Sequence, residues 1–339
     1  MTHRHAINPR ESDIPEKDVD NVFVFNFSTP KIQQRCRSDP TVKYSLVVPF
    51  IYLYRVMCIG DEVNEDFVFS GAQTLDFTSV VSYLNNMKHI VMFSGGLGSF
   101  FAAKRVIDLY GTEDVILLFS DTLIEDEDLY RFLDDAEKHL GVPITRIAEG
   151  RDPWQVFFDT NMLGSYRMDP CSKFLKRRIL KRWIKKNHHH KNCIIYYGID
   201  WTEEHRLKTI QQRMGKYECM APLCWAPFQS KQDLRDELEQ LGIRIPRLYT
   251  LGYFHNNCGG WCVKSGQAQF ALLLKHFPER YKYHEDMEQK FREKTGKDVA
   301  IMRKMTNYER KPITMKQFRE WLEAGKSYDI HEFGGCGCA

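Results

Sequence analysis

The chain has 339 residues, 43% of them hydrophobic, with 48 lysines and arginines against 45 aspartates and glutamates. This length allows two or three domains, and the net charge of +3 excludes a protein that holds polyanions by its overall charge. The sequence contains no apolar run long enough to span a membrane, and the first residues lack the apolar core of a secretory signal. We therefore expect a cytoplasmic protein whose cysteines are reduced.

The first 87 residues predict no function. Residues 1–20 are polar and contain proline, which indicates a flexible tail. Residues 21–87 hold runs rich in aromatic and β-branched side chains, such as VFVFNF and YSLVVPFIYLYRVMCI. These runs predict an appended N-terminal region of mixed or β character.

Between residues 88 and 245 short apolar strands alternate with helices. KHIVMF, DVILLFSDT, ITRIAEG and NCIIYYGID read as buried strands, and SFFAAKRVIDLYG and EDEDLYRFLDDAEKHLG read as the helices that follow the first two. This alternation predicts an α/β fold with a doubly wound parallel sheet, whose ligands bind beyond the carboxyl ends of the strands. Residues 246–339 predict a mostly helical C-terminal segment, with a helix break near Pro278 and a last short helix in TMKQFREWLEAG.

The first predicted strand ends in FSGGLGS, a glycine-rich turn at the start of a helix. The N-terminus of a helix attracts anions, and glycine lets a phosphate approach the backbone closely. The spacing matches neither GxxxxGK[ST] nor GxGxxG, and an ordinary strand-to-helix turn is the simpler alternative. The predicted phosphate-binding residues are Ser94, Gly95, Gly96, Gly98 and Ser99.

These motifs resemble the PP-loop ATP-pyrophosphatase (adenine nucleotide alpha-hydrolase-like) superfamily, whose loop SGGxDS stands here as SGGLGS, with Gly98 in place of the aspartate. FSDTLIEDEDLYRF, DPCSKFLKRR and GIDWTEEHR look like further segments of the PAPS reductase-like branch, which includes the sulfur-transfer enzymes of DNA phosphorothioation. The resemblance covers roughly residues 88 to 339 and implies a sheet of the HUP type.

The resemblance implies that ATP, with Mg²⁺, is split between its α and β phosphates to adenylate a substrate. The 94–99 loop would hold the leaving pyrophosphate, and cationic side chains would stabilise charge on the α-phosphate. Asp121 and Thr122, at the end of the second strand, would border the adenine and ribose, although Asp121 reads equally well as a helix cap. Glu204 is either a site residue or a structural partner of Arg206. The implied catalytic residues are Lys176, Arg206 and Glu204, with Arg177 as a further cation.

Five cysteines in three short motifs form a second candidate site. HNNCGGWCVKSG and EFGGCGC contain two closely spaced pairs, and MDPCSKFLK adds a single cysteine. Closely spaced thiolates separated by glycines suit a soft metal or an iron–sulfur cluster. We expect a 4Fe–4S cluster, with Zn²⁺ or free redox thiols as alternatives. The predicted metal ligands are Cys171, Cys258, Cys262, Cys336 and Cys338, whereas Cys36, Cys58, Cys193, Cys219 and Cys224 are expected to be ordinary thiols of the core.

The stretch 173–191 predicts a helix with a basic face, which is either simply solvated or in contact with a nucleic-acid backbone. The sequence as a whole predicts an ATP-pyrophosphatase that adenylates an acceptor for sulfur transfer to a nucleobase or nucleic acid. One alternative is a thiol oxidoreductase of the PAPS reductase type, with the C-terminal cysteines as reductant. The other is an inactive nucleotide-binding regulator, which the departure at Gly98 favours.

Overall fold

The computed structural model describes residues 87–306, 309–332 and 334. The expectations for residues 1–20 and 21–87 lie outside this part, apart from Met87. Within it, five parallel strands form one sheet in the order β3-β2-β1-β4-β5, so the predicted α/β fold with a parallel sheet is confirmed. The strands are β1 (Lys88–Met92), β2 (Val115–Asp121), β3 (Ile144–Ala148), β4 (Cys193–Tyr197) and β5 (Glu218–Met220).

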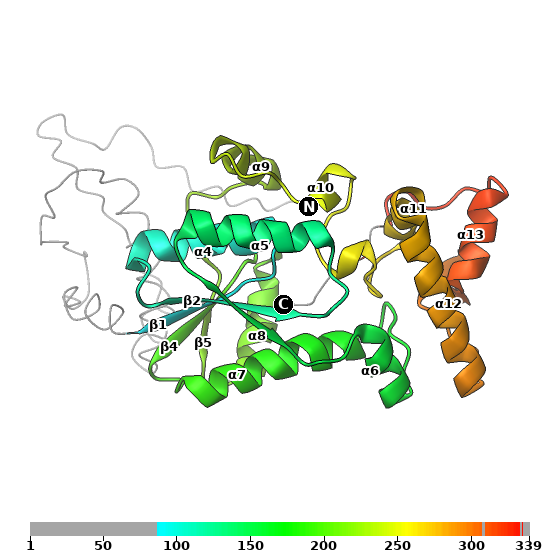
Figure 1. Cartoon of the computed structure of the whole chain (residues 1–339), viewed down its shortest axis with the longest axis horizontal. Helices are drawn as coiled ribbons and strands as arrows, with labels where there is room; N and C mark the ends of the chain where they lie inside the picture. Colours follow the sequence, from blue (N-terminus) through cyan, green and yellow to red (C-terminus); the bar gives the residue numbers. More distant parts are fainter. Residues whose placement is uncertain (1–86, 307–308, 333, 335–339) are drawn as a thin grey trace, which may run out of the picture.

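Helices cover both faces of the sheet (Figure 1). Successive side chains of β1 explain why: Val91 packs against the helices of one face, Ile90 against those of the other, and both are fully buried. A strand covered on both sides must be apolar throughout, which is how β1 reads. One face carries α4 (Leu97–Tyr110), α5 (Glu127–Leu140) and α9 (Lys231–Gln240), and the other carries α7 (Ile179–Asn187) and α8 (His205–Met214).

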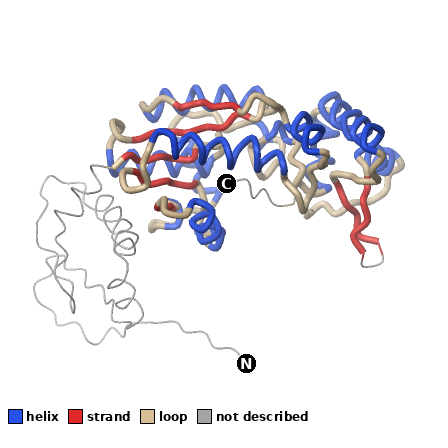
Figure 2. Tube along the Cα trace, turned by 90° about the horizontal axis from the view of Figure 1, so that it is seen from below, coloured by secondary structure: helices blue, strands red, loops and turns tan. Residues whose placement is uncertain are grey.

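A second hydrophobic core lies beside the sheet, at the right in Figure 1. The predicted helix break at Pro278 and the last helix are confirmed. An antiparallel hairpin, which the sequence did not predict, projects from this part (Figure 2). The core is built from α6 (Pro153–Thr160), α11 (Gln267–His276), α12 (Pro278–Thr295), α13 (Met315–Glu323) and the hairpin strands β6 (Met302–Thr306) and β7 (Glu309–Ile313).

Short helical segments carry the loops that matter for the site. A π-helix, η1, directly precedes α7 and begins after Cys171, and such segments are frequent at functional sites. The short segments are η1 (Ser172–Arg178), η2 (Trp201–Glu203), η3 (Pro222–Cys224), α10 (Arg247–Thr250) and η4 (Cys258–Gly260).

A buried carboxyl group ties the hairpin and α13 to α12. Glu288 is only 1% exposed and accepts hydrogen bonds from the backbone N–H groups of Ile301, at 2.8 Å, and Met315, at 2.6 Å. Burial raises the pKa of Glu288 to about 7, against the opposing effect of these two hydrogen bonds. The folded state therefore keeps a proton on Glu288 at pH values where the unfolded chain has lost it.

We expect this proton to make stability depend on pH. Because the folded pKa is raised above its ordinary value of 4.5, the stabilisation is fully present below pH 4.5 and is lost as the pH rises to about 7. The loss is about 3 kcal/mol, and Glu288→Gln, which cannot ionise, should remove this part of the pH dependence. Urea unfolding at pH 5 and pH 8 measures it, with the exposed Glu279→Gln of the same helix as control. Equal pH dependence in wild type and Glu288→Gln would refute the assignment.

Candidate nucleotide pocket and cysteine cavity

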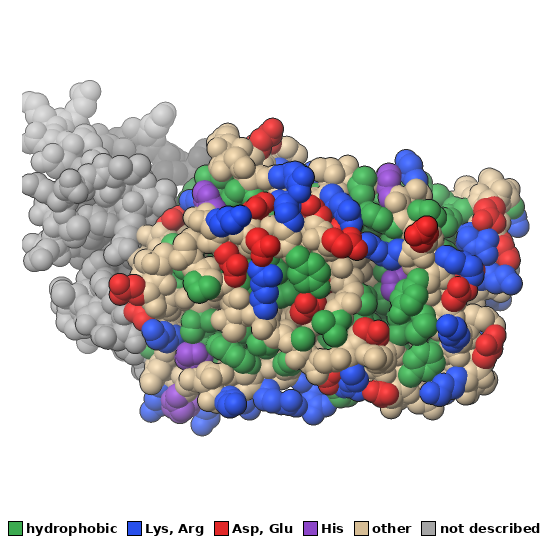
Figure 3. Space-filling model, viewed as in Figure 1, with side chains coloured by type: hydrophobic (Ala, Val, Ile, Leu, Met, Phe, Trp, Pro, Cys, Tyr) green, Lys and Arg blue, Asp and Glu red, His purple; other side chains and the backbone are tan. Residues whose placement is uncertain are grey.

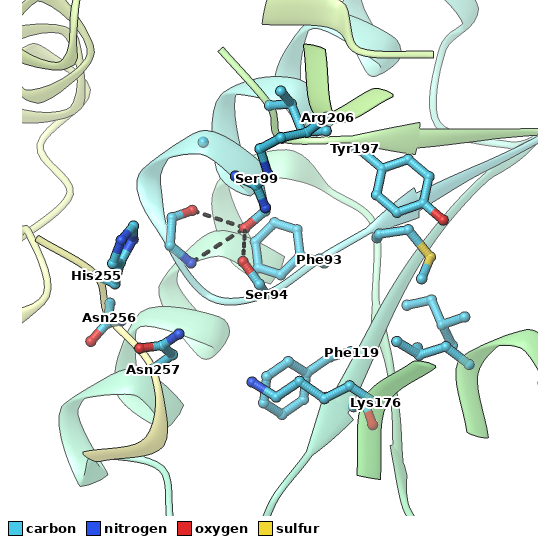
Figure 4. Close-up of a pocket in the computed structure, with 18 of the residues that line it drawn as sticks. Phe93, Ser94, Ser99, Phe119, Lys176, Tyr197, Arg206, His255, Asn256 and Asn257 are labelled. Atoms are coloured by element: carbon cyan, nitrogen blue, oxygen red, sulfur yellow. Dashed lines mark hydrogen bonds between the residues drawn. The ribbon is translucent and has the colours of Figure 1, made fainter. Parts of the chain in front are cut away.

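A pocket of about 190 Å³ lies beyond the carboxyl ends of the adjacent strands β1 and β4 (Figure 4). After β1 the chain enters α4 on one face of the sheet, and after β4 it leads to α8 on the other. The two loops therefore diverge and leave a crevice between them, which is where open α/β sheets bind ligands. Phe93, Ser94, Ser99, Lys176 and Arg206 are among the residues that line it.

The glycine turn at this pocket is held in place by side chains. Gly95 has a φ of +74°, and a Cβ there would meet Leu129 of α5 at 3.0 Å. The Ser99 hydroxyl donates to the Gly96 carbonyl at 2.9 Å and accepts from the Gly96 N–H at 3.3 Å. The Asn256 amide, 4% exposed, donates to the Gly95 carbonyl at 2.8 Å. Because the turn is held from both sides, its geometry is set before any ligand binds.

The glycine at position 98 has a packing reason. A Cβ on Gly98 would lie 2.6 Å from the carbonyl oxygen of Gly198, and a Cβ on Gly198 would lie 2.4 Å from the carbonyl carbon of Gly98. The loops after β1 and β4 thus meet backbone to backbone. An aspartate at position 98 does not fit unless these loops separate.

Two predicted cations line the pocket, and both have acidic neighbours. Lys176 lies 3.6 Å from Glu125, and Arg206 donates to Glu203 at 2.8 Å. The partner of Arg206 is therefore Glu203 and not Glu204, which is exposed where α8 begins. The spacing explains the difference, because residues three apart share a helical face and residues two apart do not.

At the end of β2, the two residues expected at the nucleotide site, Asp121 and Thr122, lie elsewhere. Phe119 and Ser120 line the pocket, but Asp121 and Thr122 do not appear among its lining residues. The Asp121 carboxylate accepts from the Tyr130 hydroxyl at 3.0 Å and from a backbone N–H at 2.8 Å, as a turn-forming carboxylate does. The Thr122 hydroxyl donates to Glu125 at 2.8 Å, and its side chain borders a different cavity.

That second cavity, of about 20 Å³, is lined by three of the predicted cysteines, Cys171, Cys258 and Cys262. Cys258 has a φ of +49°, and Gly259 and Gly260 also have positive φ, so the CGG turn is tight. Cys336 and Cys338 lie outside the described residues. Among the side chains that are described, no three His, Cys, Asp or Glu groups are placed to hold a metal ion.

One acidic residue, which the sequence analysis missed, contacts residues that line the two cavities. Glu125 is 8% exposed and accepts hydrogen bonds from the Thr122 hydroxyl and from the backbone N–H of Cys258, and its carboxylate lies 3.6 Å from the Lys176 ammonium group. Lys176 lines both the pocket at β1 and β4 and the cysteine cavity. Glu125 stands in an acidic run, EDED, and nothing in the sequence distinguishes it from its neighbours. Arg177, by contrast, is held by Asp169 at 2.9 Å and does not line the pocket.

The cysteines expected in the core behave as buried thiols where the structure describes them. Burial raises the pKa of Cys193 to about 11 and the pKa values of Cys219 and Cys224 to about 12. Such thiols stay protonated near neutral pH and are poor metal ligands. Cys36 and Cys58 lie outside the described residues.

Comparison with known proteins leaves the family open. No family model matches the chain. An uncharacterized protein of Methanocaldococcus jannaschii is 23% identical over 208 residues, which are 60% of this chain and 42% of that protein. The chain thus spans less than half the length of this relative. Over the part of the chain that is described, no helix has the length and apolar character needed to cross a bilayer.

Proposed function

We propose that the pocket at β1 and β4 binds ATP and that the chain transfers the adenylyl group to an acceptor with release of pyrophosphate. The observation that carries the proposal is the held glycine turn at the start of α4, with Lys176 and Arg206 across the same pocket. On this reading the sheet is of the HUP type, and the chain is a PP-loop protein of the PAPS reductase-like branch.

In the proposed reaction the turn holds the β and γ phosphates. The backbone N–H of Leu97 lies 3.4 Å from the Tyr249 hydroxyl, and a phosphate oxygen would take the place of that hydroxyl. An acceptor oxygen forms a bond to the α-phosphorus of ATP. The bond between the α-phosphorus and the oxygen that bridges to the β-phosphate breaks, and pyrophosphate leaves with that electron pair. Lys176 and Arg206 stabilise the negative charge that develops on the α-phosphate.

Mg²⁺, when bound, would neutralise part of the negative charge of the phosphates. Among the described lining residues Glu203 is the carboxylate that faces this pocket, so it would hold the ion together with phosphate oxygens and water. Glu203 also pairs with Arg206, which places both charges beside the same phosphates.

The thiols that line the second cavity are donors of the kind that a soft metal prefers, but the described side chains do not form a ligand set of three. About 20 Å³ accommodates one particle of the size of water, so an eight-atom 4Fe–4S cluster does not fit the loop as it stands. We propose a thiolate-bound Zn²⁺ here and derive no reaction step from a cluster.

Two measurements test the proposal. The first is equilibrium binding of ATP in the presence of Mg²⁺, and the second is chromatography of the products formed from ATP. We expect ATP to bind and, with acceptor present, AMP-containing product and pyrophosphate to form. Arg206→Gln should slow pyrophosphate release about a hundredfold, as the loss of a donor to developing charge does. Arg213→Gln, exposed at the end of the same helix, should change it less than twofold.

Other products decide between the alternatives. Release of ADP and phosphate, or no ATP binding by the wild type, contradicts adenylation. ATP retained without turnover across all acceptors supports the regulator, and reduction of an adenylylated sulfate by the chain's thiols supports the oxidoreductase.

A further inference from the structure

A larger cavity, of about 970 Å³, opens next to the nucleotide pocket. The two share the Gly98–Gly198 contact, Arg206, Tyr249 and His255 on their walls. Anything held in the larger cavity therefore lies beside the groups that we assign to the phosphates of ATP. Its volume is at the upper end for small-ligand sites and exceeds what a small acceptor needs.

The charges on its wall favour an anion. Arg206, Lys231, Arg235 and Lys264 line it, against Asp200 and Glu203. The guanidinium carbon of Arg235 lies 5.8 Å from the ring centroid of Tyr249, which also lines the cavity, so a cation and an aromatic ring lie next to each other on its wall.

Exposed aromatic rings accompany these cations. Tyr166 and Phe254, which line the cavity, are 46% and 50% exposed. Trp201, next to the lining residue Asp200, is 48% exposed, and its ring lies 6.0 Å from that of Phe228, which is 61% exposed. Large rings left in water beside lysines and arginines are the arrangement on which unpaired bases stack while their phosphates are neutralised.

The position of the cavity suits an acceptor. Lys264 lines both this cavity and the cysteine cavity, and Gly334 forms part of the wall. A group bound there contacts Arg206, and Lys264 separates it from the cysteine cavity.

We propose that this cavity and its aromatic rim bind single-stranded nucleic acid as the acceptor, a proposal that rests on the adenylation proposed above. The basic face of α7 is the competing surface. Its lysines and arginines gather along the lower edge in Figure 3, but none of the large exposed apolar side chains of the described residues lies on α7. The α7 face can neutralise phosphates but has no exposed ring on which a base could stack, whereas the cavity has both cations and exposed rings.

The test measures binding of a fluorescein-labelled 12-nucleotide strand of mixed sequence, as DNA and as RNA, by anisotropy at 50 to 200 mM salt. The full chain is used without ATP, so the result does not depend on adenylation, and ATP binding is measured on the same preparation. Lys231→Gln with Arg235→Gln removes two charges from the cavity. Lys185→Gln with Lys186→Gln removes two from α7. Phe254→Ala is matched by Tyr283→Ala, an exposed ring on α12.

The cavity pair should weaken binding at least tenfold and lower the salt slope by about 1.4, which is the loss of two phosphate contacts to a single strand. Phe254→Ala should weaken binding about fivefold or more, as the loss of one stacked base does. The double variant of α7, Lys185→Gln with Lys186→Gln, and the single variant Tyr283→Ala should each change binding less than twofold. The proposal fails if the α7 pair weakens binding as much as the cavity pair. It also fails if AMP competes as well as the strand, or if no strand binds to protein that binds ATP. Absence of ATP binding would instead refute the proposed function.

Discussion

Gly98→Ala is expected to abolish ATP binding. The added methyl group would stand 2.6 Å from the carbonyl oxygen of Gly198, which is backbone and cannot rotate away. The loops after β1 and β4 must then separate, at a cost of about 1–3 kcal/mol in stability, and the pocket between them loses its shape. Gly98→Asp, which restores the aspartate of the SGGxDS motif, should do the same or worse. Equilibrium binding of ATP and urea unfolding measure the two effects.

Gly96→Ala is the matched control, two residues earlier in the same turn. A Cβ there would lie 3.0 Å from the hydroxyl at the end of the Tyr249 side chain, which can move, and 3.8 Å from the Ser94 hydroxyl, which is an ordinary contact. We expect this variant to keep the stability of the wild type within about 0.5 kcal/mol. If Gly98→Asp instead raises ATP affinity, the close contact of the two loops does not govern the pocket, and the motif requires its aspartate here as elsewhere.

Cys262→Ser is expected to remove the metal from the protein. Wild-type protein prepared without oxygen should carry about one Zn²⁺ per chain, because three thiols line a cavity with room for one ion. Loss of one thiolate ligand should lower the metal content at least tenfold under dialysis. Elemental analysis together with acid-labile sulfide distinguishes the ion from a cluster.

Cys224→Ser provides the control for this substitution. Cys224 lies outside the cysteine cavity, and burial raises the pKa of its thiol to about 12, so it should not contribute a thiolate. Metal content should therefore be unchanged in Cys224→Ser. Iron and sulfide in equal amounts would contradict the single ion and support the 4Fe–4S cluster, and a metal-free wild type with reactive thiols would contradict both.

Local sequence patterns were sufficient to predict the longer strands of the sheet and the glycine turn after the first of them. The continuous apolar runs of β1, β2 and β4 and the glycine turn after β1 are short-range signals, and each was placed correctly. β5, with three residues, and the hairpin of β6 and β7 were missed because segments so short have little periodicity. The hydrogen bond from Asn256 to Gly95 joins residues 161 positions apart, a separation that no local pattern reports.

The sequence by itself determined the parallel α/β sheet and the turn at 94–99, and it singled out Cys171, Cys258 and Cys262, which line one cavity. Periodicity, glycine spacing and cysteine spacing are local properties of the chain, so a sequence can report them. Only the tertiary structure decided which groups meet. The tertiary structure pairs Arg206 with Glu203 and places Thr122 at the cysteine cavity. It also brings Glu125 within 3.6 Å of Lys176, which lines both cavities, and packs Gly98 against Gly198. These contacts depend on where separate strands end in space, and that is fixed by the packing of the whole sheet and its helices.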